Sequence, residues 1–169
     1  MQFALLTISD SRTKASDQSG QLIKQLLQEA GMTCLAYQVA SDDVVEIQSA
    51  YLALERQNPA LIITNGGTGI AQKDVTLPAL QPLLITPIPG IGEAFRTLSY
   101  QAVGPRALAS RASAGFNYRQ QLTYCLPGSP NAVELAVKEL ILPTYQHLLF
   151  ERSNARKELH DHVNATHSH

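Results

Sequence analysis

The sequence has little of what marks a disulfide-bonded, nucleic-acid-binding or membrane protein. Its 169 residues include two cysteines and no tryptophan, and the formal net charge is −1. A chain so close to neutral lacks the positive charge that drives non-specific binding to nucleic acid. Cys34 and Cys125 both lie in apolar, strand-like runs, which indicates buried, reduced thiols of a cytosolic protein rather than a disulfide or a metal site.

The apolar stretches are also too short to cross a bilayer. The opening MQFALLTISDSR is apolar, but no basic leader precedes it and no cleavage site of small residues follows it. It therefore indicates a first β-strand rather than a signal peptide. These absences predict a cytoplasmic protein with neither a membrane nor a nucleic-acid partner.

What is present fits an ordinary globular protein. Hydrophobic residues make up 44% of the chain and charged residues 16%, a composition typical of a folded domain. The length suffices for one domain with its own core. We expect one domain over residues 1–150, followed over residues 151–169 by a polar, histidine-rich tail that is disordered.

Apolar runs and helical spacing alternate along the chain. Ser41 or Asp42 is expected to cap a helix that begins at Asp43. The alternation predicts an α/β domain with a mainly parallel sheet covered by helices on both faces. The predicted strands are Phe3–Ser9, Thr33–Val39, Leu61–Thr64, Ile85–Ile88 and Leu122–Leu126, and the predicted helices are Gly20–Gly31, one from Asp43 to before Asn58, one from Thr76, Gly90–Tyr100 and Ala132–Leu140.

Three polar loops follow predicted strands. They are Ser9-Asp10, the glycine-rich stretch after Leu61–Thr64, and PGSPN, residues 127–131. In parallel α/β sheets, ligands bind at the carboxyl ends of the strands. The three loops therefore predict a ligand site at this edge of the sheet.

The glycine-rich loop, within LIITNGGTGIAQKDVT, matches neither of the common nucleotide motifs. Lys73 follows Gln72 and precedes Asp74, so the phosphate-loop pattern fails, and Gln72 occupies the third glycine position of the dinucleotide fingerprint. Consecutive glycines still allow backbone N–H groups to approach and bind an anion. The alternative is a tight turn between a strand and a helix that binds no ligand.

Asp74 adds a negative charge to this anion-binding loop. A divalent cation removes the conflict, because Mg²⁺ is commonly held by one or two carboxylates together with substrate phosphates. Asp42, which follows the second predicted strand, would be a second such carboxylate if the fold brings it close. The alternative for both aspartates is a helix cap.

Four segments, TNGGTGIAQKDVT, PGIGEAFRTLS, ASRASAG and LPGSPNAV, resemble in order the signature segments of the MoaB/MogA family of molybdenum-cofactor biosynthesis proteins. The same fold occurs in the G domain of gephyrin and its plant relatives. The resemblance extends from about Phe3 to about Tyr145. It implies a three-layer α/β/α sandwich, assembled as a homotrimer or homohexamer, that works beside other molybdenum-cofactor enzymes. It also implies molybdopterin adenylyltransferase activity, in which molybdopterin and Mg-ATP give adenylylated molybdopterin and pyrophosphate.

The family's functional positions can be carried over one at a time. Its TGGTG loop begins here with Asn65, and its two catalytic aspartates correspond to Asp74 and Asp42. Because inactive MoaB-type paralogues lack such carboxylates, their presence favours an active enzyme. The substrate-binding positions implied by the resemblance are Gly66, Gly67, Thr68, Gly69, Ser110, Arg111, Gly128, Ser129, Pro130 and Asn131.

The resemblance also implies a role for each group. Asp42 and Asp74 would hold Mg²⁺ against the ATP phosphates, the glycine loop would cradle a phosphate, and Arg111 would neutralise anionic charge. Ser129 and Asn131 would hydrogen-bond the pterin or its phosphate. The attacking phosphate of molybdopterin is already anionic, so no strong base is needed. Arg96 is expected to be a surface charge, and Arg106 receives no role.

Two other functions fit parts of the sequence. A non-catalytic molybdopterin-binding or scaffold protein would share the same fold, whereas a molybdate-inserting enzyme would carry further domains. The terminal HDHVNATHSH pairs histidines as His160-x-His162 and His167-x-His169, a spacing that binds Zn²⁺, Ni²⁺ or Cu²⁺. The alternative for that segment is a solvated tail without a metal function.

Overall fold

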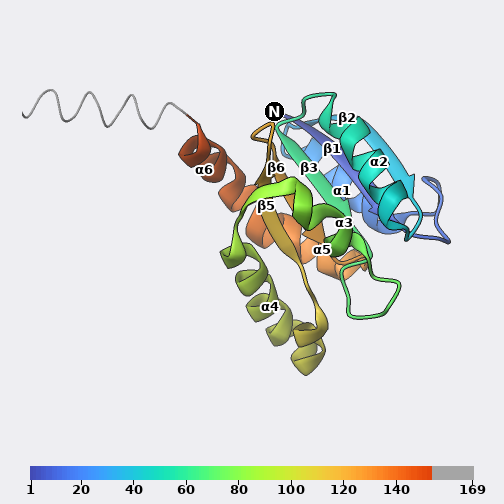
Figure 1. Cartoon of the computed structure of the whole chain (residues 1–169). Helices are drawn as coiled ribbons and strands as arrows, with labels where there is room; N and C mark the ends of the chain where they lie inside the picture. Colours follow the sequence, from blue (N-terminus) through green and yellow to red (C-terminus); the bar gives the residue numbers. More distant parts are fainter. Residues whose placement is uncertain (154–169) are drawn as a thin grey trace, which may run out of the picture.

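A six-stranded sheet forms the middle layer of the protein, with helices on both faces (Figure 1). The computed structural model describes residues 1–153. The strands lie in the order β2-β1-β3-β6-β5-β4. Their bounds are β1 (Gln2–Ile8), β2 (Thr33–Ala40), β3 (Leu61–Asn65), β4 (Leu84–Pro87), β5 (Ser113–Asn117) and β6 (Leu122–Leu126).

The sheet is mixed but mainly parallel. Strand β1 pairs in parallel with β2 and β3, and β3 pairs in parallel with β6. Strand β5 is antiparallel to both β6 and β4, so among the six strands of residues 1–153 it alone runs in the opposite direction. The predicted α/β class with a mainly parallel sheet between two helical layers is confirmed.

The helices divide between the two faces. Figure 1 shows α2 and α3 over one face of the sheet and α1 and α5 behind it. The α-helices are α1 (Gln18–Glu29), α2 (Val44–Glu55), α3 (Thr76–Leu80), α4 (Pro89–Val103), α5 (Pro130–Ala136) and α6 (Leu142–Arg152). Shorter helical turns cover Gln81–Leu83, Gly104–Ala109 and Val137–Ile141.

Alternation along β1 builds a separate core on each face. Phe3 and Leu5 point toward a cluster that includes Ile23 and Leu27 of α1 and residues of α4, α5 and α6. Ala4 and Leu6 point the other way, toward residues of α2 and α3. Because every second side chain of a strand points to the same face, one continuous apolar run supplies both cores.

The start of α2 differs from the prediction in a way that matters for the site. The helix begins at Val44, and the side chain of Asp43 accepts hydrogen bonds from the backbone N–H groups of Val45 and Glu46 at 2.9 and 3.0 Å. Neither Ser41 nor Asp42 is the cap, so that prediction was wrong. One cap satisfies the first turn, and Asp42 is left for other contacts.

Strand β5 was not among the predicted strands. Its residues, SAGFN, include alanine and glycine, which have low β propensity, so the segment is a strand because of its neighbours rather than its composition. Both edges of β5 are paired, Ser113 lying opposite Cys125 and Gly115 opposite Pro87.

The last helical segment is longer than predicted. It continues past Leu140 through a π-helical turn, Val137–Ile141, into α6, which ends at Arg152. Pro143, which has no N–H group to donate, lies at the start of α6, directly after the π-helical turn. The wider turn before it lets the chain continue as a helix. Within residues 1–153, no helix is both long enough and apolar enough to span a membrane.

The hydrogen bonds of Tyr51 join α2 to the sheet. This fully buried hydroxyl lies 2.8 Å from the Thr123 Oγ1 atom and accepts from Asn117 Nδ2 at 3.1 Å. Burial raises the pKa of Tyr51 to about 12, so the hydroxyl keeps its proton at neutral pH. We predict that Tyr51→Phe lowers the free energy of unfolding by about 1–3 kcal/mol, because its partners stay buried without it.

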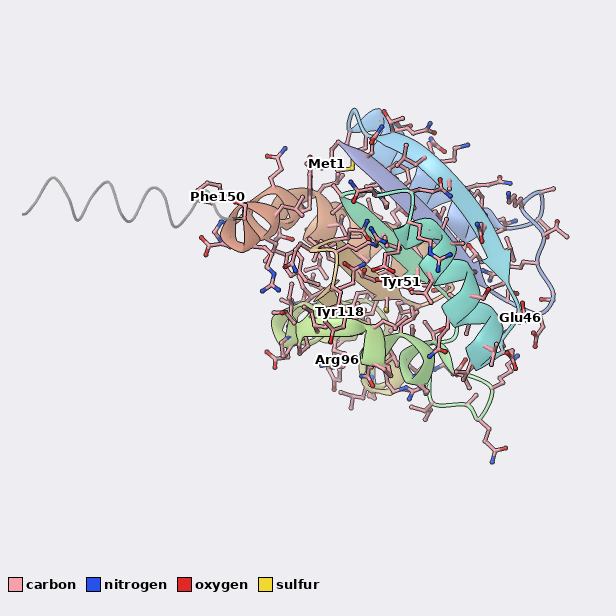
Figure 2. All side chains as sticks on the ribbon, turned by 45° about the horizontal axis from the view of Figure 1, so that its top comes forward. Met1, Glu46, Tyr51, Arg96, Tyr118 and Phe150 are labelled. Carbon is pink, nitrogen blue, oxygen red and sulfur yellow. The ribbon has the colours of Figure 1, made fainter. Side chains whose placement is uncertain are left out.

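Tyr118→Phe is the matched control, since Tyr118 is 76% exposed (both tyrosines are labelled in Figure 2). Urea denaturation followed by circular dichroism would measure both variants. Equal unfolding midpoints for the two would contradict the role given to Tyr51.

Candidate active site

The three central parallel strands end at the same level, which brings their loops together. Thr7 of β1 pairs with Asn65 of β3, and Asn65 pairs with Leu126 of β6. The backbone N–H of Gly66 donates to Leu126 O at 3.0 Å and ties the glycine loop to the end of β6. A cleft of about 370 Å³, called the strand-end cleft below, lies at these ends.

The glycine loop has a backbone that other residues would not adopt. Gly66 and Gly67 have φ angles of +99° and +63°. A Cβ atom on Gly66 would lie 2.2 Å from Ile8 O, and one on Gly67 would lie 2.3 Å from Thr76 Oγ1. Thr76 also fixes the loop, because its Oγ1 donates to Gly66 O at 2.8 Å and its N–H to Gly67 O at 3.1 Å. Both positions therefore require glycine.

The two predicted aspartates lie against this loop. A Cβ on Gly67 would be 3.2 Å from Asp42 Oδ1, and one on Gly69 would be 2.6 Å from Asp74 Oδ2. Both aspartates and the segment Gly66–Gly69 line the strand-end cleft. The structure thus brings together the loops after β2 and β3, including Asp42 and Asp74, which are 32 positions apart in the sequence.

Neither aspartate caps a helix. The residue before α3 is Val75, and Asp74 Oδ2 instead accepts from the N–H of Ala71 at 2.9 Å. Asp42 Oδ2 accepts from the N–H of Asp10 at 3.2 Å, while its own N–H donates to Asp10 Oδ1 at 2.9 Å. In the described part of the chain, Oδ1 of each carboxylate has no hydrogen-bond partner, so one oxygen of each could bind a cation.

Burial and neighbouring charges act on the carboxylate of Asp42. Burial raises the pKa of Asp42 above its ordinary value, and the carboxylates of Asp10 and Asp74 raise it further. The N–H of Asp10 and the positive charge of Lys73 act in the opposite direction. Like charges gathered in one cleft disfavour ionisation, and a divalent ion between them would reverse that effect.

These residues fit Mg²⁺ shared with a substrate better than a metal held by protein alone. Across residues 1–153, no three histidine, cysteine, aspartate or glutamate side chains are grouped closely enough to hold a metal ion. Two carboxylates are the number that Mg²⁺ commonly takes from a protein when phosphates and water supply its other ligands. Both expected magnesium ligands, Asp42 and Asp74, line this cleft, and their role in binding Mg²⁺ stays a prediction.

A buried hydroxyl in the loop also lacks a partner. Thr68 is 2% exposed and lines the strand-end cleft, yet its Oγ1 makes no hydrogen bond to the residues described here. A buried polar atom without a partner costs roughly 1–3 kcal/mol. A ligand oxygen in the cleft would supply the missing partner.

Arg111 supports the loop from outside the strand-end cleft. Its Nε donates to Gly69 O at 2.8 Å and its Nη2 to Asp74 O at 2.7 Å. Its backbone N–H donates to Thr68 O at 3.0 Å. The guanidinium thus fixes both ends of the segment that carries Asp74, and the role toward ligand charge that the resemblance implies for it stays a prediction.

Of the remaining predicted ligand residues, all but Pro130 line one of two hollows. Gly128 lines the strand-end cleft. Ser110, Ser129 and Asn131 instead line an adjoining hollow of about 280 Å³, and Pro127 lines both. Ser129 is also the cap of α5, because its Oγ accepts from the N–H of Ala132 at 3.3 Å, and Pro130 is the first residue of that helix.

Sequence reasoning missed two cations of the cleft, Arg12 and Lys73. Arg12 lies in the loop after β1, where the prediction names only Ser9 and Asp10, and Lys73 enters the prediction only through the failed phosphate-loop pattern. Their position at the carboxyl ends of strands was the signal that could have found them. Arg106 lines the adjoining hollow, and Arg96 lies in a separate depression on α4.

The fold and this cleft define an α/β ligand-binding domain, and comparison with known proteins specifies the class. A family model described as "Probable molybdopterin binding domain" matches residues 4–147. "Molybdenum cofactor biosynthesis protein B" of Bacillus anthracis is 45% identical over 149 residues, which cover 87% of this chain and 88% of that protein. The chain therefore belongs to the molybdopterin-binding family of molybdenum-cofactor biosynthesis proteins, and the resemblance to MoaB and MogA is confirmed.

Solved structures agree with this assignment. A crystal structure of a molybdenum cofactor biosynthesis protein B has a TM-score of 0.85 and 43% identity, with 89% of this chain and 94% of that chain covered. The tungsten cofactor synthesizing protein MoaB of Pyrococcus furiosus has a TM-score of 0.82 and 31% identity, with 89% and 96% covered. The histidine-rich segment, for which a metal role was considered, lies outside the described residues.

We predict that the charges around Asp42 set the pH range in which the cleft binds a cation. Asp10→Asn keeps an oxygen for the Asp42 N–H but removes a negative neighbour, so it should lower the pKa of Asp42. Lys73→Gln removes a positive neighbour and should raise it. NMR titration of the carboxyl ¹³C signals would measure both shifts.

The direction in which pH changes metal binding depends on which form of the Asp42 carboxyl group binds the ion. Mg²⁺ binds the deprotonated carboxylate, so binding weakens as the pH falls through the pKa of Asp42. This loss should occur at lower pH in Asp10→Asn and at higher pH in Lys73→Gln. Shifts in the same direction for both variants would contradict the electrostatic description of the cleft.

Proposed function

We propose that the protein acts in the biosynthesis of the molybdenum or tungsten cofactor by adenylylating molybdopterin with Mg-ATP. The observation that carries the proposal is the convergence of Asp42, Asp74 and the glycine loop in one cleft. The names of the relatives, which mention molybdenum and tungsten cofactors, support the pathway. We further propose, from the family resemblance, that the protein forms a homotrimer or homohexamer and works beside other enzymes of the pathway.

The reaction would transfer an adenylyl group between two phosphates. An oxygen of the molybdopterin phosphate would form a bond to the α-phosphorus of ATP, and the bond from that phosphorus to the β-bridging oxygen would break. Pyrophosphate would leave with the bridging oxygen. The attacking oxygen is already anionic, so no side chain has to remove a proton.

The residues of the cleft would act by position and charge. Asp42 and Asp74 would hold Mg²⁺, which offsets phosphate charge when bound. The N–H groups of the loop and the unpartnered Thr68 Oγ1 would contact phosphate oxygens, while Arg111 keeps the loop in place through two of its carbonyl groups. The adjoining hollow, with Ser110, Ser129 and Asn131 along one part of its wall, would hold the ring system of one substrate.

We predict that Asp74→Asn and Asp42→Asn each lower kcat by about 100-fold or more, since each removes a charge that holds the ion against the phosphates. The fold should be retained, because an asparagine oxygen can still accept the loop hydrogen bond. Asp43→Asn is the matched control. It makes the same charge change at the neighbouring position, where asparagine caps a helix as well as aspartate does.

Turnover would be measured as pyrophosphate released from ATP in the presence of molybdopterin. Wild-type rates for Asp74→Asn would rule out the proposed metal role. A loss in Asp43→Asn as large as that in Asp42→Asn would show that general charge, rather than the cleft geometry, governs the rate.

A second prediction separates the enzyme from a non-catalytic molybdopterin-binding or scaffold protein. Incubated with excess molybdopterin, ATP and Mg²⁺, the enzyme should release many equivalents of pyrophosphate per chain, and chelation of Mg²⁺ should stop the release. Stoichiometric molybdopterin binding without pyrophosphate would instead establish the scaffold and refute the adenylyltransferase.

A further inference from the structure

The loop after β1 carries an arginine that neither the sequence motifs nor the proposed mechanism uses. Arg12 lines the strand-end cleft, and its side chain is 32% exposed. Its Nη1 atom donates to Gly128 O at 3.0 Å and lies 3.5 Å from Asp17 Oδ1. Through these two contacts, Arg12 joins the wall of the cleft to the buried start of α1.

Asp17 lies at the centre of a buried polar network. The residue is fully buried, and its Oδ2 accepts from the hydroxyl groups of Thr7 and Tyr37. Its Oδ1 accepts from the N–H of Gly20 at 3.0 Å, as the cap of α1. The space around it is full, because a Cβ on Gly20 would lie 2.2 Å from Asp17 Oδ2.

The hydrogen-bond distances indicate that the position of Arg12 depends on Asp17, and not the reverse. Thr7, Tyr37 and Gly20 together satisfy the Asp17 carboxylate, and the contact to Arg12 is the longest that it makes. Asp17 therefore keeps its position without Arg12. Arg12, by contrast, is partly exposed, and its position is fixed only by Asp17 and the Gly128 carbonyl group among the residues described.

The carbonyl group of Gly128 accepts a second hydrogen bond. Gly128 O accepts from Ser19 Oγ at 2.7 Å as well as from Arg12. Both anchors of the guanidinium are thus rigid parts of the fold. A guanidinium held at one of its nitrogen atoms loses less freedom on binding a ligand than a mobile one does.

Arg12 keeps donors for a ligand after these contacts. A guanidinium has five N–H groups, and Nη1 supplies two of them. The three N–H groups on Nε and Nη2 have no hydrogen-bond partner among residues 1–153. Nε and Nη2 form the planar edge that binds two phosphate oxygens at once.

We propose that Arg12 contacts the triphosphate of bound ATP and that Asp17 is the residue that positions its guanidinium. This inference depends on the proposed function in that it assumes a phosphorylated ligand in the strand-end cleft. The two cations of the cleft then have different tasks. Lys73 acts on the charge of Asp42, whereas the contacts of Arg12 lie on the side of the cleft formed by Gly128.

The test measures the binding of inorganic tripolyphosphate, with Mg²⁺ present, by isothermal titration calorimetry. Arg12→Gln should weaken binding by about tenfold or more, since a charge-assisted contact is lost. Arg12→Lys should recover part of the loss, because it restores the charge but not the planar edge. Arg56→Gln is the matched control: it removes the same charge at an exposed position just after α2, outside the cleft, and should leave binding unchanged.

The positioning role has its own readout. Because Asp17→Asn changes a buried centre and could unfold the protein, Tyr37→Phe is the second variant, since it removes a donor to Asp17 and leaves Arg12 intact. Wild-type protein should show a distinct ¹⁵Nε signal of Arg12 that shifts when tripolyphosphate binds. In Tyr37→Phe that shift should be smaller and binding several-fold weaker, whereas a purely structural role would change only the melting temperature.

The outcomes separate this inference from the proposed function. Equal affinities for Arg12→Gln and Arg56→Gln, or no saturable binding by the wild-type protein, would overturn the role of Arg12. If adenylylation proceeds and Arg12→Gln leaves the KM for ATP unchanged, this inference alone fails. If tripolyphosphate binding depends on Arg12 but no pyrophosphate is formed from ATP and molybdopterin, the proposed function fails and the role of Arg12 stands.

Discussion

Parallel pairing of β1, β3 and β6 is the constraint on which the site depends. The three strands pair in register up to Thr7, Asn65 and Leu126, so the loops that follow them leave the sheet at one edge. Each loop contributes a different kind of group: Arg12 after β1, the glycine turn after β3 and Gly128 after β6. Parallel strand β2 adds Asp42 from the next position in the sheet. No single segment of the chain contains the site.

Hydrogen bonds from neighbouring side chains hold the glycine loop at this edge, and the loop lines the cleft. Gly66 and Gly67 have positive φ angles that bring the chain close to Ile8. Thr76 donates hydrogen bonds to the carbonyl groups of both glycines. Arg111 adds two further hydrogen bonds from outside the cleft. Polar groups that would otherwise compete for a ligand are thus used to hold the loop, while N–H groups and carboxylate oxygens remain available. Such preorganisation suits a reaction that needs position and charge rather than a strong base.

The sequence was sufficient for the parts of the fold that follow from local pattern. Apolar runs located five of the six strands, and helical spacing located the main helices. The site residues could be named from the family resemblance, because local sequence alone leaves a turn or a helix cap as the alternative for the glycines and the aspartates. Their proximity in space was a hypothesis until the pairing of β2, β1 and β3 was known, because local sequence carries no information about strand order.

The differences from the prediction have specific physical causes. Strand β5 was missed because the small residues of SAGFN have low β propensity. The segment is a strand because it pairs with β4 on one side and β6 on the other. The cap of α2 was placed at Ser41 or Asp42 because three adjacent polar residues can all cap a helix, and only the structure shows that Asp43 does so. The ligand role expected of Arg111 stays a prediction, and the structure adds that two of its five N–H groups donate to backbone carbonyl groups of the loop, which a sequence cannot show.

The most direct test of the central claim is to locate a divalent ion in solution. Mn²⁺ can replace Mg²⁺ and broadens the NMR signals of nearby nuclei, so substoichiometric Mn²⁺ with ATP would identify the residues around it. If the ion binds at the strand ends, broadening should be strongest for the amide signals of Gly67–Gly69, Asp42 and Asp74. Broadening confined to the histidines of the terminal segment, or spread evenly over the protein, would contradict a cation site at the strand ends.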